Sequence, residues 1–298
     1  LYLRYDGRTG AGEELMMNRL ILGILVFCVS LPVFSLEPVS PITDPATNQV
    51  RPGKVSWIDL VTEDIRTAGA FYQSVFGWNV AYSRDGTFAD VSHDGVPIAT
   101  ISHYEEKAPD DGAVWLISIS VRDVNAAANL VIATGGEVLA GPEDLEDRGR
   151  YALVRDPQGA MFLLLQARGG DPEDIEARMN DWLWAELWTD DPQAATEFYE
   201  AVIGYRSVAF KDISGDEIQV MGRDGKPRAT VVGIPWEGVE PNWLPYIQVE
   251  DIVSTASSVI RYGGEVLIAP MEDADGSRVA VAAGPTGGVF ALQQRAEP

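Results

Sequence analysis

The chain has little of three things: thiols, imidazoles and positive charge. Its 298 residues include one cysteine, two histidines, and 22 Lys and Arg against 45 Asp and Glu. One cysteine excludes an intramolecular disulfide. The formal net charge of −23 argues against a nucleic-acid partner, which requires basic patches, and predicts a soluble protein with an acidic surface. His93 and His103 fall in a predicted turn and at a strand end, where we expect surface or structural roles.

Long apolar runs are also lacking. The longest, 20–31, follows the short basic segment 16–19 and precedes Val33-Phe34-Ser35, which places small residues at the −3 and −1 positions of a signal-peptidase site. The run is too short for a membrane span. We therefore expect residues 1–35 to comprise an upstream extension and a signal peptide, with cleavage after Ser35 and a periplasmic or secreted protein.

The single cysteine lies inside this leader. Lipidation of Cys28 is the alternative interpretation, but such signals require a small preceding residue and Phe27 is large. Cleavage after Ser35 leaves a mature chain without a thiol, which excludes a cysteine nucleophile. The Pro-rich segment 36–54 has no hydrophobic periodicity and is predicted to be a tether.

A long internal repeat determines the architecture. The segment 57–78 reads WIDLVTEDIRTAGAFYQSVFGW, and 184–205 reads WAELWTDDPQAATEFYEAVIGY. Each copy begins with an alternating strand, continues with an Asp-capped helix and ends at a glycine. A second strand–helix–strands unit follows in each half, marked by Gly-Gly after its helix. Domains are therefore predicted at 55–167 and 182–294, joined by a linker at 168–181.

Four βαβββ units with these motifs resemble the vicinal oxygen chelate superfamily, which includes glyoxalase I, extradiol dioxygenases and bleomycin resistance proteins. The resemblance rests on the strand–Asp–helix–Phe-Tyr–Gly signature and on the later Gly-Gly and Asp156-Pro157-Gln158-Gly159 motifs. It implies an α+β fold of two tandem glyoxalase-like domains. Each domain should fold two βαβββ units into an eight-stranded cup, with helices outside and a ligand inside.

Metalloenzymes of that superfamily take His and Glu ligands from the first, fifth and last strands of a cup. The matching positions here are Trp57, Leu116 and Leu163 in the first domain and Trp184, Leu244 and Ala291 in the second. Indole and alkyl side chains do not bind divalent ions. We therefore expect no metal and no other cofactor.

Strand alternation still predicts a pocket with a few polar groups. A carboxylate, Asp59 or Glu186, follows two residues after a Trp in both copies, and Arg150 is matched by Arg278. These side chains could contact a ligand, could form the internal ion pairs Asp59–Arg150 and Glu186–Arg278, or could lie exposed at the surface. The candidate ligand-binding residues are Trp57, Asp59, Ser118, Arg150, Trp184, Glu186, Trp188, Tyr246, Gln248, Arg278 and Gln293.

Three functions fit this sequence. The first is an exported protein that binds a small organic molecule without a metal, as a monomer or homodimer. The second is a lyase, isomerase or dioxygenase-type enzyme with an unusual or absent metal site, in which Asp59 or Glu186 serves as general base. The third is a structural or interaction module whose cups bind nothing. The sequence leaves open whether the protein is an enzyme.

Overall fold

The structure is a computed structural model that describes residues 40–103, 112–211, 217–272 and 276–296. The leader predicted at 1–35 lies outside the described residues. Within them, no helix is both long and apolar enough to cross a membrane. The chain forms two eight-stranded sheets, with strand orders β2-β3-β4-β1-β5-β8-β7-β6 and β10-β11-β12-β9-β13-β16-β15-β14. The predicted α+β fold of two tandem eight-stranded domains is confirmed.

The first sheet contains two βαβββ units that meet at its centre. In the first unit, the helix α2 (Ile65–Phe76) follows β1, and in the second, α3 (Val124–Ala133) follows β5. The strands are β1 (Val55–Thr62), β2 (Asn79–Tyr82), β3 (Phe88–His93), β4 (Val96–His103), β5 (Val114–Ser120), β6 (Glu137–Leu145), β7 (Gly149–Arg155) and β8 (Met161–Ala167). Strands β1 and β5 pair antiparallel and form the floor of the sheet.

The second sheet repeats this order. Its helices are α4 (Pro192–Ile203) and α5 (Ile252–Arg261). Its strands are β9 (Trp182–Thr189), β10 (Arg206–Lys211), β11 (Glu217–Arg223), β12 (Lys226–Gly233), β13 (Asn242–Gln248), β14 (Glu265–Glu272), β15 (Arg278–Ala283) and β16 (Val289–Gln294). Strands β9 and β13 form its floor and pair in the same antiparallel manner.

Local sequence explains where the helices begin and end. The Asp64 carboxylate accepts hydrogen bonds from the backbone N–H groups of Arg66 and Thr67, so it caps α2 as predicted. Asp191 caps α4 in the same way through Ala194. Both helices end at a glycine in the left-handed conformation, Gly77 with φ 75° and Gly204 with φ 77°.

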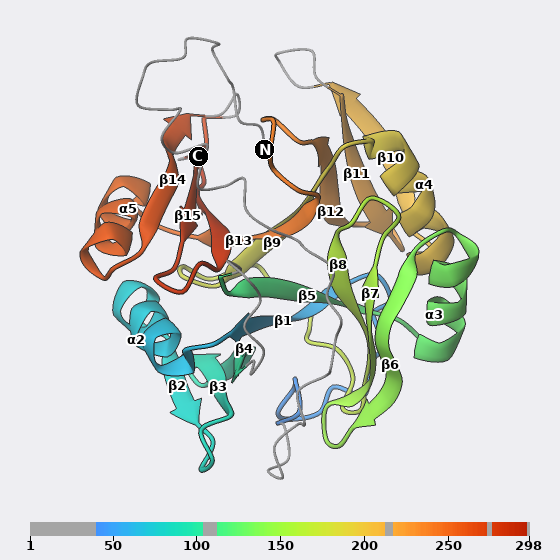
Figure 1. The fold of residues 1–298 in the computed structure, drawn as a ribbon, viewed down its shortest axis with the longest axis horizontal. Helices are drawn as coiled ribbons and strands as arrows, with labels where there is room; N and C mark the ends of the chain where they lie inside the picture. The colour runs from blue at the N-terminus through green and yellow to red at the C-terminus, as the bar shows by residue number, and fades with distance from the viewer. Residues whose placement is uncertain (1–39, 104–111, 212–216, 273–275, 297–298) are drawn as a thin grey trace.

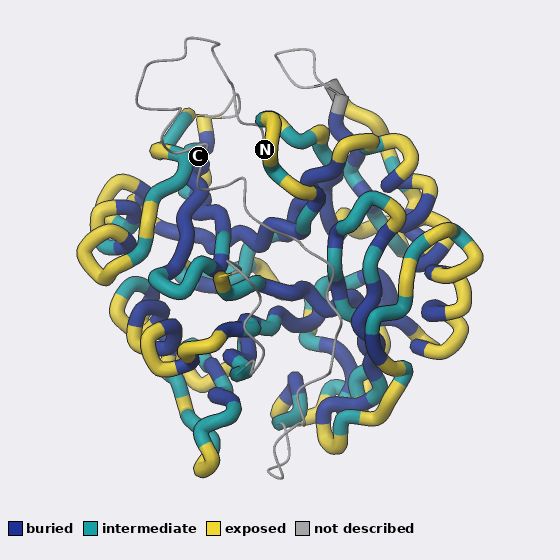
Figure 2. The backbone as a smooth tube through the Cα atoms, viewed as in Figure 1, coloured by how far each residue is buried: buried dark blue, intermediate teal, exposed yellow. Residues whose placement is uncertain are grey.

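The main core lies between the two sheets. Figure 1 shows the sheets curving away from each other, with α2 and α5 together on one side and α3 and α4 together on the other. One hydrophobic cluster therefore includes residues of both halves, and the backbone at the centre of Figure 2 is buried. The Tyr72 ring lies 5.8 Å from Phe290, and the Tyr199 ring lies 5.3 Å from Phe162. Each first helix thus packs aromatic side chains against the other domain.

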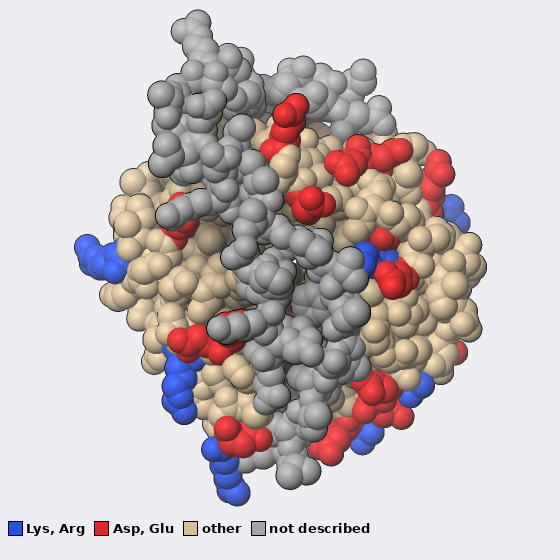
Figure 3. All heavy atoms as spheres, in the orientation of Figure 1, with Lys and Arg blue, Asp and Glu red and all other residues tan. Residues whose placement is uncertain are grey.

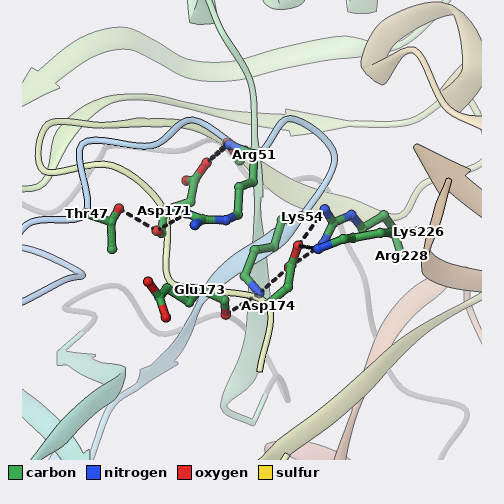
Figure 4. A network of polar contacts seen from close by, with 9 residues as sticks. Thr47, Arg51, Lys54, Asp171, Glu173, Asp174, Lys226 and Arg228 are labelled. Carbon is green, nitrogen blue, oxygen red and sulfur yellow. Dashed lines mark hydrogen bonds and ion pairs between the residues drawn. The ribbon is translucent and has the colours of Figure 1, made fainter. Parts of the chain in front are cut away.

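The linker 168–181 joins the halves through charged groups (Figure 4). Asp174 forms ion pairs with Lys54 at 3.0 Å, Lys226 at 2.6 Å and Arg228 at 2.6 Å, and so connects the start of β1 to β12. Asp171 accepts hydrogen bonds from the Arg51 backbone and from the Ser120 hydroxyl. Elsewhere, acidic side chains are dispersed over the face drawn in Figure 3 and do not gather in one patch.

Candidate functional site

Each sheet has one face against the common core and one concave face directed away from it. We call the concave face of the first sheet cup 1 and that of the second sheet cup 2. Cup 1 is lined by two small apolar clusters, which include Trp57, Tyr151 and Leu165 in one and Leu116 and Leu153 in the other. Cup 2 has one larger cluster, built around Trp188, Leu244, Tyr246, Val279, Val281 and Ala291.

Cup 1 contains an ion pair between a buried arginine and a partly buried aspartate. Arg148, at the turn before β7, is 4% exposed and places its Nη1 atom 3.2 Å from Oδ1 of Asp59 on β1. Its Nη2 atom donates to the Thr100 hydroxyl at 2.8 Å. Its guanidinium carbon lies 4.8 Å from the centre of the Trp57 ring. Burial raises the pKa of Asp59, and the pairing with Arg148 offsets part of that rise.

The chain itself fills the rest of this part of cup 1. Residues 40–48, which we call the strap, enter the cup before β1, and Ile42 is 2% exposed against Trp57, Tyr151 and Leu165. The Nε atom of Arg148 donates to the Ser40 carbonyl oxygen at 3.2 Å. The strap belongs to the segment predicted as a tether, so part of that segment is packed against the first domain.

The predicted partners of the two carboxylates are wrong. Arg150 does not reach Asp59; it bonds to Asn125, the Pro142 carbonyl and Asp144. Strand alternation explains the difference, because Ala152 and Val154 on the same face of β7 belong to the core between the sheets. Arg278 likewise shares its face of β15 with Ala280 and Ala282, so neither arginine points into a cup.

Cup 2 contains a buried carboxylate whose partners are neutral. Glu186 is 4% exposed, and its Oε1 atom accepts hydrogen bonds from Trp188 Nε1 at 3.0 Å and from the Tyr246 hydroxyl at 2.9 Å. Its Oε2 atom accepts one from the Thr230 hydroxyl at 2.8 Å. Burial raises the pKa of Glu186, and these three hydrogen bonds work in the opposite direction. Within the described ranges, no Lys, Arg or His forms an ion pair with it.

Other predicted residues surround Glu186. Trp184 is partly buried and donates to the Thr230 hydroxyl at 3.0 Å, and Trp188 lies 5.6 Å from Trp236 between ring centres. At one end of the cup, Gln248 and Gln293 are register neighbours on β13 and β16 and are 5% and 2% exposed. The Oε1 atom of each has no hydrogen-bond partner within the described part of the chain. Ser118 is also buried, but it lies in cup 1.

The repeat permits a position-by-position comparison of the cups. Asp59 lies opposite Thr100 on β4, and Glu186 lies opposite Thr230 on β12. Arg150 pairs with Gln166 and Arg278 pairs with Gln294, so Arg150 and Arg278 are equivalent positions. Two residues earlier in each copy, Arg148 therefore corresponds to Gly276. The one cation that neutralises the carboxylate of cup 1 is therefore replaced by a residue without a side chain in cup 2.

The superfamily metal does not fit these residues. In cup 1, Asp59 pairs with Leu116, and Ser118 pairs with both Trp57 and Leu163, which brings the predicted ligand positions together at the floor. Trp57, Leu116 and Leu163 offer an indole and two alkyl groups, none of which binds a divalent ion. No group of three or more His, Cys, Asp and Glu side chains in the described residues could hold one.

Sequence reasoning missed Arg148, Thr100, Thr230 and Ile42. Thr100 and Thr230 carried a usable signal, because each lies in a strand that pairs with a first strand and faces its carboxylate. Arg148 lies in a turn, where alternation gives no direction. Ile42 lies outside the repeat, so the comparison of the two copies could not reveal it.

Sequence comparison identifies the family. The model described as Glyoxalase/Bleomycin resistance protein/Dioxygenase superfamily matches residues 54–164. The chain is 30% identical over 253 residues to CFP32 of Mycobacterium bovis, a protein named as a proposed glyoxylase, and the match covers 83% of this chain and 97% of that protein. The chain belongs to this superfamily, which is the one that the sequence motifs indicated.

More distant matches agree on the fold. The anthracycline biosynthesis protein DnrV of Streptomyces peucetius is 27% identical over 244 residues, covering 76% of this chain and 88% of that protein. The Mn(II)-bound glyoxalase of Novosphingobium aromaticivorans superposes with a TM-score of 0.59 at 17% identity, over 83% of this chain and 84% of that one. The 2,3-dioxygenase LapB of Pseudomonas gives 0.55 at 15% identity, over 84% and 93%. At these identities the structures show a shared fold alone.

Proposed function

We propose that this protein binds a small organic molecule in cup 2 without a metal ion. The observation that carries the proposal is the contrast between the cups. In cup 1, Arg148 and Ile42 occupy the space over Trp57 and satisfy the polar groups there. Cup 2 combines a buried carboxylate, two buried amide oxygens without partners and a wall of aromatic side chains. A mostly apolar surface with a few convergent polar groups is typical of small-molecule sites.

The aromatic side chains of cup 2 and one relative support a ligand with a flat aromatic part. Trp184 and Trp236, which are only partly buried, offer ring faces on which aromatic molecules stack favourably. The relative named for anthracycline biosynthesis is in line with a polycyclic aromatic ligand. The fold itself does not define the reaction or the ligand, because unrelated functions share it.

Native mass spectrometry of the protein purified from its own cells tests the proposal. We expect about one equivalent of a small organic molecule per chain and no stoichiometric metal. Trp184→Ala should reduce the bound fraction, whereas Tyr262→Ala, a change at a residue that is 46% exposed on the surface, should leave it unchanged. Stoichiometric metal, or an empty protein that takes up no molecule from a cell extract, would contradict the proposal.

A metal-independent enzyme is the second candidate. Burial raises the pKa of Glu186, which is the condition for a carboxylate that removes a proton near neutral pH. The relative named as a proposed glyoxylase supports a search for lyase or isomerase activity. Turnover that Glu186→Gln abolishes while ligand binding persists would favour an enzyme over a binding protein.

The proposed location is the periplasm or the exterior of the cell. The support is the leader pattern ending at Ser35, together with a strap that begins packing at Ser40, a few residues later. N-terminal sequencing of the mature protein tests it, with Leu36 as the expected first residue. Retention of the leader, or a lipid on Cys28, would contradict cleavage after Ser35.

A further inference from the structure

In cup 1, the site around the Asp59 carboxylate binds a guanidinium group. Three side chains surround one guanidinium: the Trp57 ring lies beneath it at 4.8 Å, Asp59 accepts from it at 3.2 Å, and the Thr100 hydroxyl accepts from it at 2.8 Å. Trp57 also donates its indole N–H to the same Thr100 hydroxyl at 3.2 Å, which fixes the orientation of the ring. A tryptophan, a carboxylate and a threonine thus form a built cation site.

Cup 2 retains the same three side chains. Trp184, Glu186 and Thr230 occupy the corresponding places on β9 and β12, and Trp184 donates its indole N–H to Thr230 at 3.0 Å, as Trp57 does to Thr100. The arginine alone is lost, since Gly276 stands in its place. Cup 2 therefore keeps the three side chains that bind a cation in cup 1 but lacks the arginine that supplies this cation.

We propose that the ligand of cup 2 carries an organic cation, a guanidinium or an ammonium group, which takes in cup 2 the place that Arg148 holds in cup 1. This inference rests on the proposed function and specifies the chemistry of its ligand. The rest of that ligand would extend along the aromatic wall towards Gln248 and Gln293, whose amide oxygens accept N–H or O–H groups.

The hydrogen bonds of Glu186 leave room for such a group. A carboxylate offers about four acceptor positions, and three are used here. Trp188 and Tyr246 are larger than their counterparts in cup 1, Val61 and Ser118, and both donate to the Oε1 atom of Glu186. The Oε2 atom accepts only from Thr230. Among the described residues, Glu186 is bonded to neutral donors alone, so none of them compensates its charge, and a cationic ligand would neutralise it.

The charges of the site also exclude the opposite ligand. The amide oxygens of Gln248 and Gln293, which lack a partner among the described residues, are acceptors, and Arg278 faces the core side of its sheet. An anion would meet Glu186 without a compensating cation, whereas a cation also gains from the tryptophan face. The chain as a whole, with a net charge of −23, attracts cations rather than anions.

Three probes of similar shape test this inference in the full chain: benzylguanidinium, the neutral benzylurea and the anionic phenylacetate. Titrations followed by tryptophan fluorescence and calorimetry should give an affinity order of cation, neutral molecule, anion. Glu186→Gln should weaken benzylguanidinium by at least about tenfold, the usual scale for a charge-assisted hydrogen bond, and should change benzylurea little.

A second variant restores the lost arginine. Gly276→Arg should reduce benzylguanidinium binding, because the new guanidinium competes for the same three side chains. Gly276 has φ 79°, so any side chain there strains the backbone. Gly276→Ala carries that strain without the cation and is the matched control; it should bind benzylguanidinium as the unchanged protein does.

The outcomes separate the two proposals. Equal binding of cation and neutral probe, both lost in Trp184→Ala, would overturn the cation site and leave a small-molecule site in cup 2. Tighter binding of phenylacetate, or no binding of any probe at millimolar concentration, would also overturn the cation site. The proposed function is tested separately by native mass spectrometry. It falls if the protein from its own cells holds stoichiometric metal, or is empty and takes up no molecule from a cell extract.

Discussion

Asp59 and Glu186 occupy equivalent places in two copies of one strand, and their neighbours give them different electrostatic surroundings. Asp59 has a guanidinium in contact, whereas Glu186 has one indole N–H donor and two hydroxyl donors. Neutral donors stabilise a carboxylate less than a cation does in a medium of low polarity. The replacement of arginine by glycine, together with the strap in cup 1 and the larger Trp188 and Tyr246 in cup 2, therefore separates a self-satisfied site from one suited to an external partner.

Removing the arginine of cup 1 should destabilise the protein strongly. Arg148→Ala leaves Asp59 buried without its cation, and breaking a buried pair in this way typically costs about 3–5 kcal/mol. Arg150→Ala is the control, because its ion pair with Asp144 is largely exposed and is expected to contribute less than about 1 kcal/mol. Urea denaturation monitored by tryptophan fluorescence measures both; similar losses would contradict the assigned pairing.

The raised pKa of Glu186 predicts the direction of a pH effect. The folded state holds this proton more tightly than the unfolded state, so its contribution to stability is present below the unfolded pKa and is lost as pH rises through the folded pKa. Glu186→Gln should remove this dependence of stability on pH. Without ligand, the variant should also be more stable than the unchanged protein at neutral pH. Denaturation curves between about pH 4 and 8 test the sign. If the stability of Glu186→Gln fell more steeply with rising pH than that of the unchanged protein, burial would not be the dominant influence on the pKa of Glu186.

Residues on the regular floor strands of both cups were predictable, and residues outside those strands were not. Alternation along β9 and β13 identified Trp184, Glu186 and Tyr246, because regular strands fix the direction of each side chain. Alternation alone does not show which face of β7 points into the cup, and Arg150 lies on the face of Ala152 and Val154, which belong to the core. The true partner, Arg148, precedes the strand, and only the folded turn shows where it points.

At the scale of elements, the strap is the feature that distinguishes the two domains. It places an isoleucine over Trp57, Tyr151 and Leu165, where cup 2 has Trp184, Val279 and Gln293. The Asn48 backbone N–H donates to the Gly169 carbonyl, and the Thr47 hydroxyl donates to the Asp171 carbonyl, so the far end of the strap is held by the linker. Strap, linker and first sheet thus stabilise one another.

Weakening the apolar anchor should loosen the strap. Ile42→Ala removes buried methyl groups at a cost of about 2 kcal/mol or more, which corresponds to roughly thirtyfold faster hydrogen exchange at the Asn48 amide if the strap opens as a unit. Val50→Ala, at a position that is 43% exposed, is the control and should change exchange little. Unchanged exchange in Ile42→Ala would mean that the linker contacts alone hold the strap.

Sequence patterns predicted the elements well, with β6 as an instructive exception. The pair Gly141-Pro142 within β6 is typical of a turn, so the sequence does not indicate a continuous strand there. The structure continues the strand to Leu145 through two register shifts. The strand is at the edge of its sheet, where an irregular residue or a proline can be accommodated without disrupting two neighbours.

At the scale of the whole molecule, the common core predicts one cooperative unit. The largest hydrophobic cluster contains residues from both domains, and α2 packs with α5 as α3 packs with α4. Calorimetry should therefore show a single transition with equal calorimetric and van't Hoff enthalpies, despite two repeats. Two separate transitions would show that the domains are independent. The oligomeric state, monomer or homodimer, stays a prediction that light scattering can test.

The ion pairs of Asp174 with Lys54, Lys226 and Arg228 should contribute to this cooperative unfolding. Burial tends to raise the pKa of Asp174, but hydrogen bonds from Arg228, Lys226 and Lys54 outweigh it and hold the pKa well below its usual value. The stability that it supplies is present above the unfolded pKa and is lost as pH falls through the folded one. Asp174→Asn should lower the free energy of unfolding by about 1–3 kcal/mol at neutral pH, with a smaller difference in acid.

A matched carboxylate serves as the control for that measurement. Glu176 pairs with Arg295, but both side chains are largely exposed, so Glu176→Gln should change stability by less than about 1 kcal/mol. High salt should reduce the effect of Asp174→Asn only in part, because its partners Lys54 and Arg228 are mostly buried. Equal effects of the two substitutions at neutral pH would contradict a special role for this cluster.

The pairing of each first helix with the other domain has a consequence for the divided chain. Phe71 packs beside Gly264 and Phe290, and Phe198 packs beside Gly136 and Phe162, so each half completes the other through equivalent contacts. A lone half would expose these aromatic surfaces to water. Because the two contact sets are equivalent, two separately expressed halves should reassemble by fragment complementation, and the first half alone should form a homodimer with itself in the place of its missing neighbour.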